Sequence, residues 1–157
     1  MCVVARFESV AAEARQRAVG GGVAGARDAP RLERAWAELC DRHGALRARA
    51  LPERDALFID PAGSAAPIRV LTPTEAELLP AITRAATERL PLHQAAARLC
   101  LVEAGPRSHV LILVAHALVA DRPSLARALG ELLALFANPR AGRPPAPRGP
   151  RYRARRE

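Results

Sequence analysis

Six consecutive apolar residues at positions 110–115 end at His116, and this run limits the folds open to the chain more than any other feature. A short continuous apolar run rich in β-branched residues is typical of a strand that is buried on both faces. Asp121 closes the loop that follows, and Pro123 suits the first turn of a helix, because its missing N–H would be unpaired there anyway. The segment therefore predicts a buried strand, a short loop and then a helix.

The helix expected after Pro123 has one apolar stripe. Large apolar side chains recur at helical spacing, at Leu125, Leu129, Leu132, Leu133 and Phe136. His116 then lies at the carboxyl end of a strand, where open α/β sheets usually place their chemistry. The loop from His116 to Asp121 is therefore the candidate functional site.

This loop resembles the His-His-x-x-x-Asp-Gly motif of the condensation domains of nonribosomal peptide synthetases, which share a fold with chloramphenicol acetyltransferase. His116 and Asp121 match the first histidine and the aspartate of the motif. Ala117 stands where the family has its second histidine, which it uses in catalysis, and Arg122 stands where it has glycine. Alanine can neither accept a proton nor hold an amine, so the resemblance predicts a catalytically impaired site.

A second family motif, Arg-His-x-x-Leu-Arg-x-x-Phe, leaves a helix and enters a strand. It is matched here by Arg42, His43, Leu46 and Arg47, with Ala50 in place of the aromatic residue. The resemblance makes Arg47 the favoured ion-pair partner of Asp121, with Arg49 next. The residues alone leave another role open for Asp121, because an aspartate two residues before a helical proline is well placed as an N-cap.

Two interpretations of His116 also remain open. It is either a remnant or relocated general base, or a structural histidine at a strand end that hydrogen-bonds to the backbone. Arg122 brings a long cation to a loop where the family leaves room for substrate, so it either fills the entrance or pairs with Asp121. The other histidines, His43, His93 and His109, show no metal-ligand spacing.

The fold class expected from the resemblance is α/β, a mixed sheet with about three packed helices that corresponds to one lobe of the two-lobe family fold. Residues 23–137 form that lobe, residues 1–22 form an N-terminal helix and a glycine-rich turn, and residues 138–157 form a Pro/Arg-rich linker or disordered tail. The family joins carrier-bound thioesters into an amide, so the implied substrates carry phosphopantetheine and no cofactor is bound directly. Half of a two-lobe fold also exposes an apolar interface, which predicts self-association.

Composition bounds the alternatives. The net charge is +8, but seven arginines and only one glutamate lie in residues 138–157, so the basic character belongs mainly to the tail. One alternative is an interaction module that binds a carrier protein or a separate second lobe. Another is an active half that uses His116 with a partner chain, and a third is a small protein that binds nucleic acid through its tail.

The three widely spaced cysteines indicate reduced thiols in a cytoplasm, and we expect neither a signal peptide nor a membrane span.

The remaining elements follow from local patterns. Residues 3–19 have apolar positions at helical spacing, and Gly20, Gly21 and Gly22 predict a flexible turn, with a brief strand over 23–27. Asp28 predicts the N-cap of a helix that ends near His43, with its apolar face at Leu32, Ala35, Trp36 and Leu39. Two strands are expected over 56–59 and 67–71, joined by a turn at 61–64. A helix capped at Thr72 or Thr74 and a pair of strands over 97–103 and 109–114 complete the domain.

Overall fold

A five-stranded sheet forms the centre of the protein, and its strands lie in the order β1-β2-β7-β6-β5. The computed structural model describes residues 3–11, 16–51 and 56–138, and residues 3–11 are described by their backbone. Only the β5–β6 pair is parallel, so the sheet is mixed, as expected. The strands are β1 (Val3–Ala11), β2 (Gln16–Ala24), β5 (Arg69–Leu71), β6 (Ala97–Gly105) and β7 (Ser108–His116).

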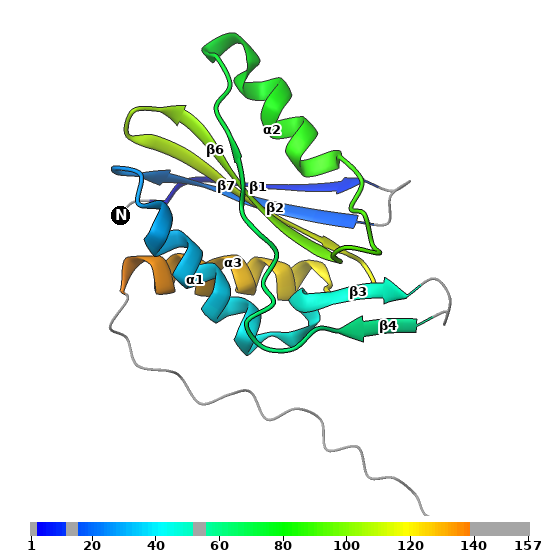
Figure 1. Cartoon of the computed structure of the whole chain (residues 1–157). Helices are drawn as coiled ribbons and strands as arrows, with labels where there is room; N and C mark the ends of the chain where they lie inside the picture. Colours follow the sequence, from blue (N-terminus) through cyan, green and yellow to red (C-terminus); the bar gives the residue numbers. More distant parts are fainter. Residues whose placement is uncertain (1–2, 12–15, 52–55, 139–157) are drawn as a thin grey trace, which may run out of the picture.

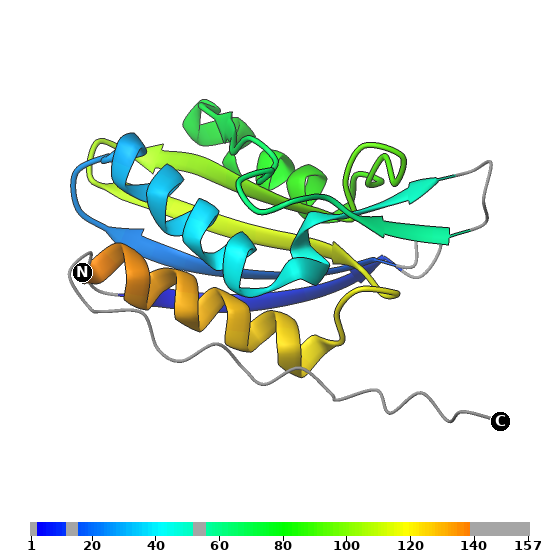
Figure 2. The ribbon, with the colours of Figure 1, turned by 60° about the horizontal axis from the view of Figure 1, so that its bottom comes forward.

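Three helices cover the sheet. Figure 1 shows α2 (Leu78–Thr87) on one face, and α1 (Ala29–Arg42) and α3 (Arg122–Ala137) on the other. In Figure 2 the face with α1 and α3 comes forward. Each face has its own core, because side chains alternate along a strand. Leu99, Leu111 and Leu113 are fully or almost fully buried on the α1–α3 side, and Ile112 and Val114 on the α2 side. The sheet is thus a layer between two helical layers, and β7 is at its centre.

A second, two-stranded sheet stands at one end of the molecule. It is formed by β3 (Ala48–Leu51) and β4 (Ala56–Ile59), and it follows α1 through a short 3-10 turn at Gly44–Arg47. Backbone hydrogen bonds attach it to the main sheet, since Ala96 N–H donates to Ala48 C=O at 2.7 Å and His116 N–H donates to Ala96 C=O at 2.9 Å. This sheet therefore lies next to the carboxyl end of β7, as Figure 1 shows.

The predicted helix starts are confirmed. The Asp28 carboxylate accepts a hydrogen bond from the Arg31 N–H, and α1 ends at Arg42. Thr74 and Glu77 form a reciprocal capping box around the short 3-10 helix Glu75–Glu77, which leads directly into α2. Such caps satisfy backbone N–H groups that have no partner within the helix. The four residues predicted for the apolar face of α1 are all buried.

The N-terminal prediction was wrong. Residues 3–11 and 16–24 form an antiparallel pair of strands in place of the expected helix, and the glycine run lies inside β2 in place of a turn. Gly20 and Gly21 pair with Ile112 and Leu111 across the sheet. The whole length of β2 is hydrogen-bonded to β7, and this tertiary pairing outweighs the weak local preference of glycine. The expected strand over 23–27 is reduced to the last two residues of β2.

The strands expected over 56–59 and 67–71 exist, but they belong to different sheets. β4 pairs with β3, whereas β5 pairs with β6. The turn after Pro61 is formed, with Gly63 at a φ of 83°, and the chain then crosses from one sheet to the other. Trp36 holds this crossing segment, because its indole N–H donates to Ala66 C=O at 2.7 Å. Across the described residues, every helix falls short of the length and apolarity needed to span a bilayer.

Candidate functional site

His116 is the last residue of β7 and is buried, with 8% of its surface exposed. Ile112 and Val114 belong to the core on the α2 side, and the alternation of a strand gives His116 the same face. Its cross-strand partner is Gln16, the first residue of β2. The predicted position at a strand end is therefore confirmed, and the imidazole lies at the edge of the core.

Hydrogen bonds tie His116 to the loop that follows. Leu118 N–H donates to Nδ1 of the imidazole at 3.2 Å, and Val119 N–H donates to the His116 C=O at 3.0 Å. An Nδ1 that accepts a hydrogen bond puts the proton of a neutral imidazole on Nε2. His116 thus shapes the turn through both its backbone and its side chain. As a general base it could use Nδ1 only if the bond from Leu118 were broken.

Ala117 lies on the turn after β7 and is exposed. Leu118 is beside it, with 69% of its surface exposed. The position that corresponds to the second motif histidine therefore presents a methyl group to solvent. A methyl group cannot take up a proton from an amine, so residue 117 brings no acid–base chemistry to this loop.

Asp121 is the N-cap of α3. Its Oδ1 accepts the Ser124 N–H at 2.8 Å, so the cap interpretation is confirmed. Hydrogen bonds from Ser124, first from its hydroxyl and then from its backbone N–H, lower the pKa of Asp121. The charges of Arg17 and Arg127 lower it further. The carboxylate is therefore held ionised at the positive end of the helix, where a negative charge is favourable.

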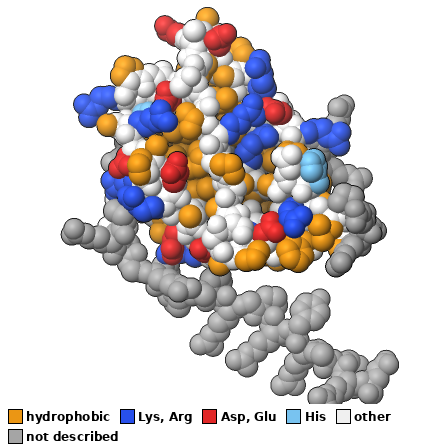
Figure 3. Space-filling view, viewed as in Figure 1, with side chains coloured by type: hydrophobic (Ala, Val, Ile, Leu, Met, Phe, Trp, Pro, Cys, Tyr) orange, Lys and Arg blue, Asp and Glu red, His pale blue; other side chains and the backbone are white. Residues whose placement is uncertain are grey.

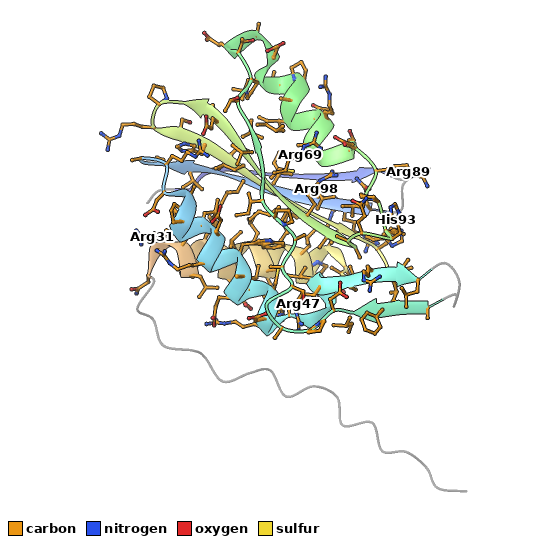
Figure 4. The ribbon with its side chains drawn as sticks, in the orientation of Figure 1. Arg31, Arg47, Arg69, Arg89, His93 and Arg98 are labelled. Carbon is orange, nitrogen blue, oxygen red and sulfur yellow. The ribbon has the colours of Figure 1, made fainter. Side chains whose placement is uncertain are left out.

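The expected pairing of Arg47 with Asp121 is corrected by the structure. Arg47 Nε donates to Cys40 C=O at 2.9 Å and its Nη1 donates to Asp60 C=O at 2.5 Å. Arg49, the second choice, pairs with the Asp60 carboxylate at 3.0 Å. Both arginines contact Asp60 because the antiparallel pairing of Ala48 with Ile59 brings the end of β4 beside the start of β3. In Figure 4 Arg47 lies beside the β3–β4 sheet.

Arg17, which the sequence analysis missed, reaches the loop. Its Nη1 donates to Ala120 C=O at 3.3 Å, and its charge acts on Asp121. It was missed because β2 was not predicted as a strand. In the structure β2 pairs with β7, and this pairing places Arg17 opposite Ala115, at the base of the loop. Arg122 is the first residue of α3 and is exposed. The Pro/Arg-rich tail beyond Asn138 lies outside the described residues.

The other candidate nucleophiles and ligands are separated. His43 links the end of α1 to α3, since its Nε2 lies 2.7 Å from the carboxylate of Glu131 in α3. Figure 4 shows His93 at the end of the molecule near β3. Burial raises the pKa of Cys40 to about 12 and also raises the pKa of Cys100, so both thiols stay protonated. Among the described residues, no three His, Cys, Asp or Glu side chains lie together in a group that could hold a metal ion.

Comparison with solved structures identifies the fold. The X-domain in its complex with OxyB from teicoplanin biosynthesis is 26% identical, with a TM-score of 0.69, and the match covers 83% of this chain and 29% of that one. A condensation domain that mediates chain release from the enacyloxin polyketide synthase is 28% identical over 80% of this chain and 26% of that one, with a TM-score of 0.63. The EpoB cyclization-docking bidomain from Sorangium cellulosum is 19% identical over 83% and 28%, with a TM-score of 0.64.

No family model matches the sequence, and no curated protein matches it. The chain spans less than a third of the length of these solved structures. Their shared fold is that of the condensation domains and X-domains of nonribosomal peptide synthetase systems. The present chain matches this fold as a condensation-domain-like N-terminal lobe.

Proposed function

We propose that the chain serves nonribosomal peptide synthesis as a condensation-like lobe that binds another protein and forms no amide bond unaided. Residue 117 carries the proposal, because it is an exposed alanine where the resemblance expects the catalytic histidine. His116 remains, but its Nδ1 already accepts a hydrogen bond from the loop. The acid–base group that the reaction needs is therefore missing from one position and engaged at the other.

Two observations support a protein partner. The teicoplanin X-domain, which shares this fold, is found in complex with OxyB. In addition, β4 presents three consecutive large apolar side chains to solvent: Leu57, Phe58 and Ile59, exposed by 42%, 44% and 54%. Side chains alternate along a strand, so Leu57 and Ile59 share one face of β4 and Phe58 lies on the other. Exposed apolar surface of this kind marks interaction sites. The partner we propose is a carrier protein or a separate second lobe, with phosphopantetheine-linked thioesters as the substrates of the assembled pair.

Binding measurements on the immobilised full chain test this proposal. The analytes are a carrier protein with and without phosphopantetheine, a separately expressed second lobe of a condensation domain, and single-stranded RNA. We expect saturable binding of the carrier or the second lobe, and the same affinity after removal of residues 138–157. Binding of RNA alone, lost with the tail, would replace the proposal by the nucleic-acid alternative.

A matched pair of variants separates binding by the lobe from nonspecific adhesion. Phe58→Ser removes an exposed aromatic side chain from β4, and Leu79→Ser removes an even more exposed apolar side chain from α2. If the second lobe contacts the β3–β4 sheet, only the first variant weakens its binding. If both variants weaken binding alike, the interaction is a general property of exposed apolar groups.

A further inference from the structure

A cavity of about 530 Å³ opens between the main sheet and the β3–β4 sheet. One wall is the crossing segment that Trp36 holds, from Ser64 to Pro67, and the opposite wall is the segment after α2, from Leu90 to Ala95. Ala48 of β3 and Ala97 and Arg98 at the start of β6 also line it. Its volume falls within the range of about 300–1,000 Å³ that is usual for small-molecule sites. His116 and Asp121 are not among its lining residues.

Three arginines line this cavity: Arg47, Arg69 and Arg98. Figure 4 shows Arg69 and Arg98 beside each other at the foot of α2, and Arg47 nearer to the β3–β4 sheet. They come from three different strands or turns, and the fold brings them to one space. In Figure 3 basic side chains gather on this face between α2 and β3.

The carboxylates of the cavity do not balance these charges. Its two acidic residues are Asp60 and Glu88. Glu88 pairs with Arg69 at 2.6 Å, whereas the Asp60 carboxylate pairs with Arg49, which lies outside the lining. Within the described part of the chain, no ion pair includes Arg47 or Arg98, whose hydrogen bonds go to backbone carbonyl groups. The cavity therefore has a surplus of positive charge.

Arg98 also has an unused donor. Its Nη2 donates to Ala85 C=O at 3.1 Å and to Glu88 C=O at 2.9 Å, which fixes the guanidinium against the end of α2. Its Nε is buried and has no hydrogen-bond partner. Because Nε is closed to solvent, a ligand in the cavity would meet the guanidinium of Arg98 through its terminal nitrogens and not through Nε.

We propose that this cavity binds a small organic anion, with its carboxylate or phosphate group held by Arg69 and Arg98 and its apolar body against Leu46, Leu90, Pro67 and Pro91. Guanidinium groups match the planar oxygen pairs of both anions. The apolar lining excludes a bare inorganic ion as the best ligand, since those side chains would then gain nothing. The cavity lining includes neither His116 nor any residue of β4, so it contains none of the residues that carry the proposed partner binding.

Calorimetric titration of the full chain tests this site with phenyl phosphate, benzoate and benzyl alcohol. The three probes share an aromatic body, and the first two distinguish phosphate from carboxylate. We expect saturable one-to-one binding of at least one anion, weakened by added salt, and none of the neutral alcohol. Equal binding of benzyl alcohol, or no binding of either anion, would overturn the proposal.

Substitutions locate the binding. Arg69→Gln and Arg98→Gln should each weaken the favoured anion about ten- to a hundredfold, because a hydrogen bond to a charged group is lost. Arg107→Gln makes the same chemical change on the exposed β6–β7 turn, outside the lining, and should leave affinity unchanged. Arg69 is only half-buried and its removal spares the core, so the test survives if Arg98→Gln fails to fold. Unaltered affinity in Arg69→Gln would contradict the site.

Discussion

Gln16 lies opposite His116 at the end of the β2–β7 pair, and its side chain ties the sheet to the end of α2. The amide nitrogen donates to Glu88 C=O at 2.8 Å and to Ala86 C=O at 3.4 Å, and the amide oxygen accepts Leu90 N–H at 3.0 Å. Only 1% of Gln16 is exposed. The residue beside the candidate histidine is therefore buried, and its side-chain amide links the sheet to the end of α2 through three hydrogen bonds.

Gln16→Ala should destabilise the fold by about 2–4 kcal/mol, because the backbone groups of the buried Ala86 and Leu90 lose their bonds to Gln16, whereas Glu88 C=O keeps its bond from Arg98. Urea unfolding followed by circular dichroism measures the change. Gln94→Ala is the matched control, since Gln94 is exposed, and it should shift the free energy of unfolding by less than about 0.5 kcal/mol. Equal effects of the two variants would show that the contacts of Gln16 contribute nothing.

Asp121→Ala should lower the thermal unfolding midpoint, because α3 loses its N-cap. Asp121→Asn should retain most of the midpoint, since asparagine caps as well as aspartate. Arg47→Ala should add to Asp121→Ala without coupling, because Arg47 contacts Cys40 and Asp60 instead. If the double mutant is destabilised by less than the sum of the two single effects, Arg47 and Asp121 interact, as the resemblance suggested.

Acid should remove the contribution of Asp121. Its pKa in the folded protein is lowered, so the stabilisation is fully present above the unfolded-state pKa of about 3.9 and is lost as the pH falls through the folded-state value. Thermal midpoints measured between about pH 6 and about pH 2 should therefore fall more steeply for the native chain than for Asp121→Asn. Parallel curves would show that the charge of Asp121 is not coupled to folding.

The exposed apolar side chains of β4 should promote self-association of the isolated chain. Light scattering at micromolar concentration should give an average mass above that of a monomer. The double variant Leu57→Ser with Phe58→Ser should shift the mass toward the monomer, whereas Leu79→Ser should have no such effect. A native chain that remains a clean monomer would contradict this prediction.

Local patterns are enough to predict the centre of the fold. The apolar run that ends at His116, the cap at Asp121 and the stripe of α3 each depend on residues close in sequence. β2 could not be predicted in the same way, because glycines at 20–22 form a strand only when β7 is beside them. For the same reason Arg17 and Gln16 were not recognised as neighbours of the site.

The partner of Arg47 shows a second limit. A motif match assigns a role from sequence position, but Asp60 reaches Arg47 and Arg49 only because the β3–β4 sheet folds back over thirteen residues. Contacts of this kind depend on the geometry of a turn and a strand register together. The arginine-lined cavity also depends on such geometry, since its walls come from four separate segments.

The most direct test of the proposed function is amide formation between two carrier-bound thioesters, followed by mass spectrometry. The chain alone should give no product, and Ala117→His alone should also give none. A missing positioned base costs about 10²–10⁴-fold, and without a second lobe the two thioesters are not held together. Ala117→His with an added second lobe is the variant expected to gain activity. Turnover by the unaltered chain alone, abolished by His116→Ala, would contradict the proposed function and make His116 the base.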